Sequence, residues 1–319
     1  MPDSIANGVR SALRQLVETY PCGVTARALD EFGWFELHSE HPATAVGVLF
    51  EEVGRSAAIV AGLDVLVTAL LSAPTTTAKD LVTLIVAEPA SEAPRGAAGY
   101  ILGPYQPTVR QLVLDISARR AWIVGSIPTP DSATAVLGID PNAQVRRVSL
   151  APASDSVLLG ADVTSDLIDG IRRAIAYQQL GHAAAMLNVA RQHVSVRFQF
   201  GRPIGSNQSV QHRLADVYVA IAAARAALDV TWDDNRSIAT SVAYVLAATA
   251  VDTATRGCMQ VCGGMGFTEE FELARMIRRS LILMGIFGSG DALQRDIGAG
   301  IIGGASVPRL GRFDVGGEA

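Results

Sequence analysis

The pattern of apolar residues changes twice along the chain, and the changes predict three regions. Over residues 1–75, apolar side chains recur at spacings of three and four, as in Val9, Leu13 and Leu16, which indicates helices. Residues 46–71 predict one long helical stretch. The apolar run 57–73 contains Asp64 and is shorter than the roughly 20 residues that span a bilayer. We therefore expect a buried helix there and no membrane segment.

Between residues 76 and 160 the pattern favours short strands. Runs rich in β-branched residues lie at 81–86, 110–115, 121–124, 133–137 and 144–150, separated by Gly, Pro and Asp turns. They predict a small antiparallel β-domain.

From residue 161 onward helices return. A long helix ends at a loop over 202–205, and the next carries an apolar stripe from Leu214 to Leu228. Two more helices, over 236–261 and 275–300, predict a four-helix bundle, and the glycine-rich tail from Gly303 is expected to fray. The fold class is therefore α+β, with a helical domain at 1–75, a β-domain at 76–160 and a helical domain at 161–319.

Composition limits the classes of function. The chain has 319 residues, of which 49% are hydrophobic, so it can bury a large core. Its net charge is −5, and it has no long basic run. A nucleic-acid surface needs clustered Lys and Arg to displace phosphate counterions, so we expect no nucleic-acid partner.

The three cysteines argue against a disulfide framework. An odd number of cysteines in a chain without a recognisable secretory signal predicts a reducing, cytoplasmic location. Cys258 and Cys262 lie four residues apart on a predicted helix, but no second Cys/His pair accompanies them. We expect them to pack in the core and to bind no metal.

Two patches carry the candidate chemistry. Arg197 begins the segment R-F-Q-F-G-R-P-I, and Gln260 begins Q-V-C-G-G-M-G-F. An arginine at a helix end often only pairs with the last carbonyl groups. Here it is combined with a Gly263-Gly264 turn that lets a backbone approach a ligand closely, and the combination favours an anion site.

These patches resemble the C-terminal domain of the acyl-CoA dehydrogenases. In that family the R-x-x-F-G arginine and the Q-x-x-G-G turn hold the ADP half of FAD and reach into the neighbouring subunit's cofactor site. The segments 28–34 and 49–56 are similar to the family's N-terminal domain, with a shortened connection. The resemblance implies an acyl-CoA substrate, FAD as cofactor, and a set of cofactor-binding residues: Arg197, Gln199, Phe200, Ile204, Gln208, Gln260, Gly263 and Gly264.

The family's catalytic base has no counterpart. The reaction needs a carboxylate that removes the proton next to the thioester. The usual position of this carboxylate falls on Phe287 or Gly288, and an alternative position falls on Ile171, so no catalytic residue is assigned. Asp291 is a possible displaced base, although an N-cap of the following helix explains it more simply.

The family's T-E-P-x-x-G-S-D segment is also reduced, to Glu88-Pro89. With these losses, the chain resembles the smaller, base-lacking subunit of the heteromeric acyl-CoA dehydrogenases of actinobacterial steroid side-chain degradation. That resemblance implies an α2β2 assembly in which a larger partner carries the base, and the steroid substrate rests on analogy. Two alternatives remain open: a self-sufficient homomeric enzyme that uses Asp291, and a structural paralogue without flavin.

Overall fold

The computed structural model describes residues 2–20, 23–71, 81–88, 98–103, 110–125, 133–149, 156–233, 237–288 and 290–306. The chain begins with five helices: α1 (Pro2–Thr19), α2 (Ala26–Glu31), α3 (Trp34–Glu40), α4 (Pro42–Ser56) and α5 (Gly62–Leu71). The predicted single helix over 46–71 is wrong. The chain turns at Ala57, whose left-handed backbone (φ 48°) ends α4. The buried helix predicted in the apolar run is confirmed as α5.

A seven-stranded sheet follows these helices. Its strands are β1 (Val82–Ala87), β2 (Ala98–Leu102), β3 (Arg110–Asp115), β4 (Arg120–Val124), β5 (Ala133–Ala135), β6 (Val145–Ser149) and β7 (Val157–Leu158). The order is β5-β6-β2-β1-β3-β4-β7. The predicted antiparallel domain is wrong at β1 and β3, which pair in parallel. β2 pairs with one edge of β1 and runs antiparallel to it. The chain then crosses to the opposite edge of β1, where β3 runs parallel to β1.

Strands β2 and β7 were not predicted. β2 contains Gly99, where an added Cβ would lie 2.8 Å from the Val86 carbonyl oxygen, so close backbone packing requires glycine. β7 is only two residues long and gives no alternating pattern.

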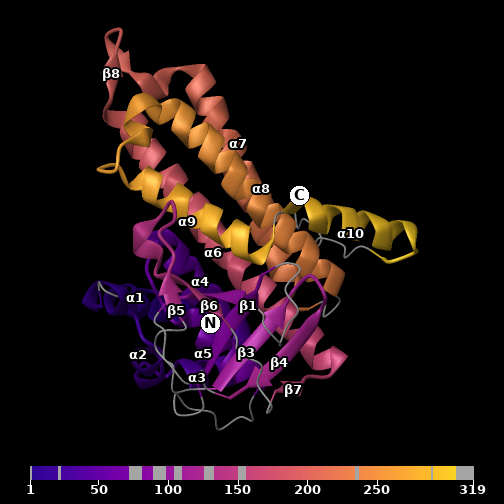
Figure 1. The fold of residues 1–319 in the computed structure, drawn as a ribbon. Coiled ribbons are helices and arrows are strands. Elements are labelled where there is room, and N and C mark those ends of the chain that lie inside the picture. Colours follow the sequence, from indigo (N-terminus) through magenta and orange to yellow (C-terminus); the bar gives the residue numbers. More distant parts are fainter. Residues whose placement is uncertain are drawn as a thin grey trace.

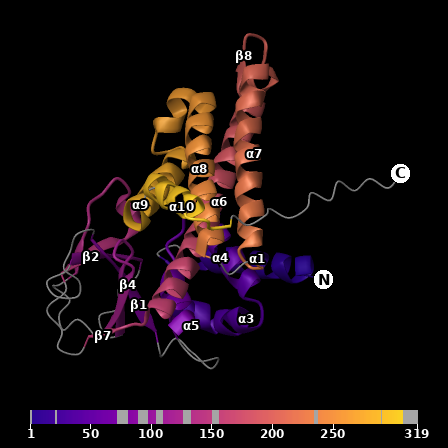
Figure 2. The ribbon, with the colours of Figure 1, turned by 90° about the vertical axis from the view of Figure 1, so that its right-hand side faces the viewer.

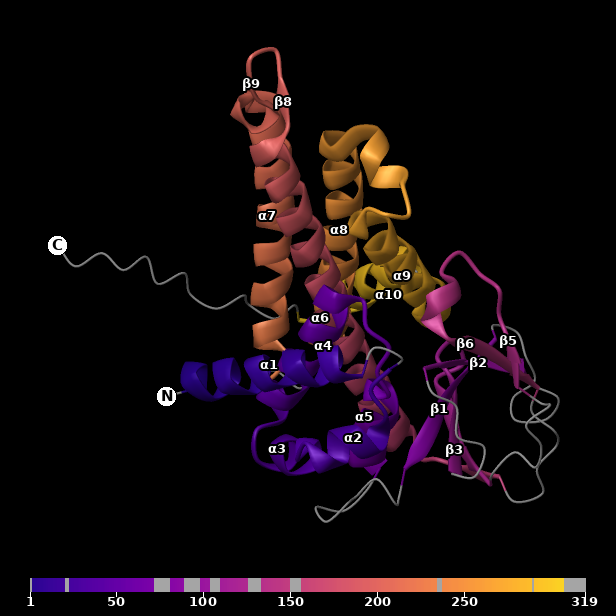
Figure 3. The same ribbon diagram turned by 90° about the vertical axis from the view of Figure 1, so that its left-hand side faces the viewer.

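The C-terminal half is helical, as predicted. α6 (Ala161–Val196), α7 (Gln208–Val230) and α8 (Ser237–Cys262) stand side by side, α9 (Glu272–Phe287) packs on α6, and α10 (Gly290–Ile302) leaves the bundle beside α8 (Figures 1, 2 and 3). The continuous last helix predicted over 275–300 is wrong, because the backbone of Gly288 (φ 95°, ψ 146°) cannot continue a helix.

The region from α8 through Phe267 is long and apolar enough to cross a membrane by length and composition. More than half of its apolar window is buried inside the protein, and α8 packs against both α6 and α7. We therefore interpret α8 as the core helix of the bundle. Within the described ranges no other helix passes this test.

Helices α4 and α6 cross with their backbones in contact. An added Cβ at Gly54 would lie 2.0 Å from the Gln178 carbonyl oxygen, and one at Gly181 would lie 2.2 Å from the Glu51 carbonyl oxygen. Beside this crossing, the buried carboxylate of Glu51 accepts a hydrogen bond from Arg225 of α7 at 2.8 Å. The crossing and the ion pair fix the N-terminal helices to the bundle.

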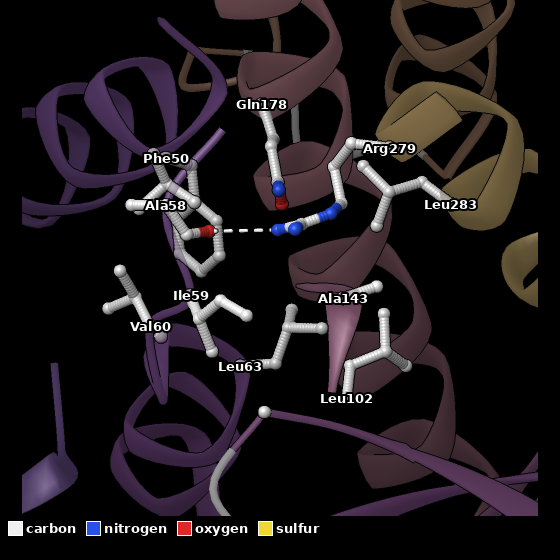
Figure 4. A pocket seen from close by; sticks show the side chains of 13 residues that line it. Phe50, Ala58, Ile59, Val60, Leu63, Leu102, Ala143, Gln178, Arg279 and Leu283 are labelled. Atoms are coloured by element: carbon white, nitrogen blue, oxygen red, sulfur yellow. Dashed lines mark hydrogen bonds between the residues drawn. The ribbon is translucent and has the colours of Figure 1, made fainter. Parts of the chain in front are cut away.

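Arg279 of α9 joins the helical parts to the sheet. Its guanidinium donates to the Asp140 carboxylate at 2.8 Å, to the Ala58 carbonyl at 3.1 Å and to the Asn142 carbonyl at 3.2 Å. Figure 4 shows this side chain above a small apolar cavity of about 40 Å³. The side chain is buried, and its contacts reach two segments, at Ala58 and at residues 140–142, so it holds these two segments against α9.

Two buried titratable groups have opposite pH effects on stability. Burial raises the pKa of Asp64 to about 7, although its carboxylate accepts a hydrogen bond from the Leu84 N–H at 2.9 Å. Burial and the nearby Arg279 lower the pKa of His182 to about 3. Asp64 therefore lowers the free energy of unfolding as pH rises from about 4 to 7, and His182 lowers it as pH falls from about 6.5 to 3.

We predict that single variants separate these two effects. Relative to the wild type, Asp64→Asn should gain stability progressively as pH rises from about 4 to 7, by an amount on the order of a few kcal/mol, and His182→Leu should gain it as pH falls below about 6.5. Urea unfolding across this range measures both differences. Differences that do not change with pH would contradict the assigned protonation states.

Candidate functional site

The first candidate site lies where α6 ends. Arg197 is the C-cap of α6, and its N–H donates to the His193 carbonyl at 3.0 Å. Its own carbonyl accepts from the Ile204 N–H at 2.8 Å. This second bond closes a hairpin formed by β8 (Phe198–Gln199) and β9 (Arg202–Pro203), which projects from the end of the bundle (Figure 1).

The hairpin turn exposes an aromatic side chain. Phe200 and Gly201 both have positive φ, 53° and 77°, as in the tight turns that match the twist of a hairpin. A left-handed conformation is unusual for phenylalanine, and the Phe200 side chain is 100% exposed. No packing within the described chain accounts for its position.

The opposite wall of the site is a glycine turn. The 3₁₀ segment η5 (Gly263–Phe267) follows α8, and Gly263 has φ 60°. An added Cβ at Gly263 or Gly264 would meet nothing within 4 Å. Packing of the described chain therefore does not require glycine at position 264, and the space beside it is open to a ligand.

Between these walls lies an open cavity of about 360 Å³. It brings together five of the eight predicted cofactor-binding residues. Phe200, Gln208 and Gln260 do not line it: Gln208 is the exposed first residue of α7, and Gln260 is exposed on α8. The lining residues are His193, Arg197, Gln199, Ile204, Val261, Cys262, Gly263, Gly264 and Met265.

The cavity is electropositive. No carboxylate is among its lining residues, and the Arg197 guanidinium forms no hydrogen bond or ion pair within the described parts of the chain. The alternative in which Arg197 pairs with helix carbonyls is therefore not what the structure has. Burial raises the pKa of Cys262 to about 11 and that of Cys258 to about 12, so both are neutral thiols, and their predicted place in the core is confirmed.

The residues of this cavity fit the phosphates of a dinucleotide such as FAD. An unpaired guanidinium matches phosphate oxygens bidentately, and the glycine turn leaves room for the backbone and the ligand to approach closely. His193 was not assigned a role from the sequence. Its position four residues before Arg197, one helical turn away, was the signal that could have indicated it.

The second candidate site, at the positions expected for the base, is filled mainly by apolar side chains, with Arg172 at its edge. Phe287 and Ile171 meet there, although they are far apart in the sequence, and both are buried. With Leu114 and Tyr244 they leave a cavity of only about 10 Å³, barely the size of one water molecule. The Tyr244 hydroxyl donates to the Gly288 carbonyl at 2.9 Å, which fixes the end of α9.

Asp291 lies apart from this apolar cluster. It is the exposed second residue of α10, two positions after the N-cap, so the N-cap role predicted for it is wrong. It does not line the cavity at Phe287 and Ile171. A carboxylate in the first turn interacts favourably with the helix dipole, which is a sufficient structural role.

The two candidate sites are separated by most of the length of α6. Ile171 and Arg197 are 26 residues apart on this helix, and a rise of 1.5 Å per residue gives about 39 Å along its axis. This distance exceeds the length of an extended FAD molecule. One FAD cannot contact both Arg197 and the cluster at Ile171 in the same chain.

The combination of N-terminal helices, a middle sheet and a C-terminal bundle is the acyl-CoA dehydrogenase fold. The Tcur3481-Tcur3483 steroid ACAD superposes with a TM-score of 0.73 at 22% identity, covering 95% of this chain and 99% of that chain. The ChsE4-ChsE5 complex from Mycobacterium tuberculosis gives a TM-score of 0.71 at 19% identity, covering 94% and 98%.

Sequence comparison gives the family. Residues 159–302 match the model of the acyl-CoA dehydrogenase C-terminal domain. The acyl-CoA dehydrogenase IpdE2 of Mycobacterium tuberculosis is 30% identical over 268 residues, 80% of this chain and 81% of that protein. IpdE2 of Mycolicibacterium smegmatis is 33% identical over 129 residues, 39% of this chain and 42% of that protein, so this match spans less than half of the relative. The chain belongs to the acyl-CoA dehydrogenase family.

Proposed function

We propose that this chain is the base-lacking subunit of an FAD-dependent acyl-CoA dehydrogenase hetero-oligomer. Its Arg197 cavity would hold the ADP half of FAD, and a larger partner would carry the base and bind the thioester. The observation that carries the proposal is the contrast along α6. At the Arg197 end the cavity is open, and the guanidinium has no partner among the described residues. At the base position, Phe287 and Ile171 fill the space.

The length of α6 supports the sharing of the cofactor between chains. When FAD is bound, its flavin ring supplies the hydride acceptor. A FAD held by its phosphates at Arg197 would have its ring beyond reach of this chain's own Ile171 and Phe287 cluster. The role of this chain would then be to bind and orient the cofactor of a neighbour.

An uncovered helix face supports a partner subunit. The outer face of α7 exposes Tyr218 (65%) and Val219 (64%), together with several alanines. Apolar faces of this kind in a folded chain commonly mark protein interfaces. An α2β2 assembly in the cytoplasm would cover them.

The relatives support the substrate class. Two structures with this fold are a steroid ACAD and a complex of two chains, ChsE4 and ChsE5. We infer from them that the substrate is an acyl-CoA thioester, a steroid side-chain CoA being the candidate. The alternatives, a homomeric enzyme based on Asp291 and a flavin-free paralogue, each predict a different outcome in the experiments below.

The direct test is the flavin content of the chain alone and together with the proposed larger subunit. We predict a flavin-poor chain alone and a yellow complex. In the complex, Arg197→Ala should weaken FAD binding by about 10- to 100-fold, as expected for a lost charge-assisted contact, and Arg197→Lys should restore it only in part. Absorption near the flavin maximum, after dilution and gel filtration, measures occupancy.

Arg213→Ala is the matched control, because Arg213 is exposed on α7 and does not line the cavity. It should leave the flavin content unchanged. Equal occupancy in the Arg197 variants and the control would give Arg197 a purely structural role. A yellow homo-oligomer with dehydrogenase turnover would instead establish the self-sufficient enzyme.

The second prediction separates the base-lacking subunit from the self-sufficient enzyme. Asp291→Asn keeps a polar side chain in the first turn of α10 but cannot accept a proton. We expect turnover of the complex to stay within about twofold, whereas loss of a general base costs about 10²-fold or more. Acyl-CoA-dependent bleaching of the flavin measures the rate, and Asp296→Asn, exposed on the same helix, is the control. A collapse confined to Asp291→Asn, with flavin retained, would identify Asp291 as the base.

A further inference from the structure

We propose that His193 is a second ligand for the phosphates in the Arg197 cavity and that it takes up a proton when they bind. This inference rests on the proposed function of the cavity. It adds a second phosphate-binding residue and a proton taken up on binding. The ligand class is a diphosphate diester, the chemistry that joins the two halves of a dinucleotide.

The geometry places His193 in the cavity. It lines the same wall as Arg197, one helical turn before it on α6. Its ring is held edge-on against Phe271, with ring centroids 5.7 Å apart and an interplanar angle of 72°. The imidazole forms no hydrogen bond within the described residues, so its nitrogens are available to a ligand.

The charges around His193 keep it neutral until an anion arrives. Partial burial and the Arg197 guanidinium lower its pKa below the ordinary value. Across the cavity, α8 contributes the neutral thiol of Cys262. The ring of Phe271, from the segment before α9, contacts the imidazole and carries no charge. No carboxylate among the described residues lines the cavity and could stabilise an imidazolium there.

A bound diphosphate diester reverses this balance. It brings two negative charges, of which Arg197 neutralises one. The neutral imidazole then takes a proton from solvent and donates an N–H to the second phosphate. Each phosphate acquires one cationic partner, and binding becomes tighter as pH falls toward 6.

The experiment uses the full chain with ¹³C-labelled histidine and ADP-ribose, whose two phosphates do not titrate between about pH 5 and 8. NMR titration of the five histidines gives each imidazole pKa with and without millimolar ADP-ribose. We expect the pKa of His193 to rise by about one unit, equivalent to about tenfold tighter binding of the protonated form. His193→Gln assigns the signal and should abolish the pH dependence of ADP-ribose affinity.

His212 is the internal control, because it is exposed on α7 and does not line the cavity. Its titration should not change, and His212→Gln should bind ADP-ribose as the wild type does. If ADP-ribose binds but the pKa of His193 does not change, the proposal that His193 takes up a proton on binding is wrong, and the proposed function stands. If ADP-ribose does not bind the chain at any pH, the His193 proposal fails, whereas the proposed function is decided by the flavin content of the complex.

Discussion

The close crossing of α4 and α6 is the contact on which the rest of the structure depends. At Gly54 and Gly181 the two helix backbones touch, and any side chain larger than hydrogen would force them apart. The crossing fixes the position of α6, the 36-residue helix that contacts α4 and α5, strand β4 and the other helices α7, α8 and α9. α4 crosses it near its middle, at Gln178 and Gly181, α7 and α8 pack against it, and the Arg197 hairpin follows its last residue.

Because α6 is 36 residues long, it keeps two chemical environments apart. At one end, Ile171 lies in a dry cluster with Phe287 that leaves no room for a substrate or a base. At the other end, the helix delivers Arg197 and His193 to an open cavity opposite a glycine turn. The separation of about 39 Å makes these ends independent within one chain, so the apolar residues at positions 171 and 287 need not disturb the cavity at Arg197. We infer that this independence is what allows the two activities to be divided between different subunits.

Much of the helical fold could be predicted from the sequence, because buried helix faces repeat at 3.6 residues. The positions where the chain turns, and the pairing of the strands, could not be predicted in this way. Ala57 and Phe200 adopt left-handed backbone conformations that no local signal predicts for alanine or phenylalanine, and the parallel pairing of β1 with β3 depends on where β2 docks. The flexible tail predicted from Gly303 lies mostly outside the described residues.

For the site, the sequence predicted Arg197, Gln199, Ile204, Gly263 and Gly264 together, and the structure places them around one cavity. The resemblance to a family motif made this possible, since nothing local joins residue 197 to residue 263. The cofactor-binding roles of all eight residues stay predictions, and Phe200, Gln208 and Gln260 do not line the cavity. The convergence of Ile171 with Phe287 could not be foreseen from spacing, because it depends on how α9 packs against α6.

The most direct measurement is a cryo-electron microscopy map of the flavin-loaded complex of this chain with its larger partner. We predict FAD phosphates within hydrogen-bonding distance of the Arg197 guanidinium, and a flavin ring that lies against the partner, beside a carboxylate of that chain. A flavin ring seated against Phe287 and Ile171 of this chain, or phosphates bound away from Arg197, would contradict this prediction.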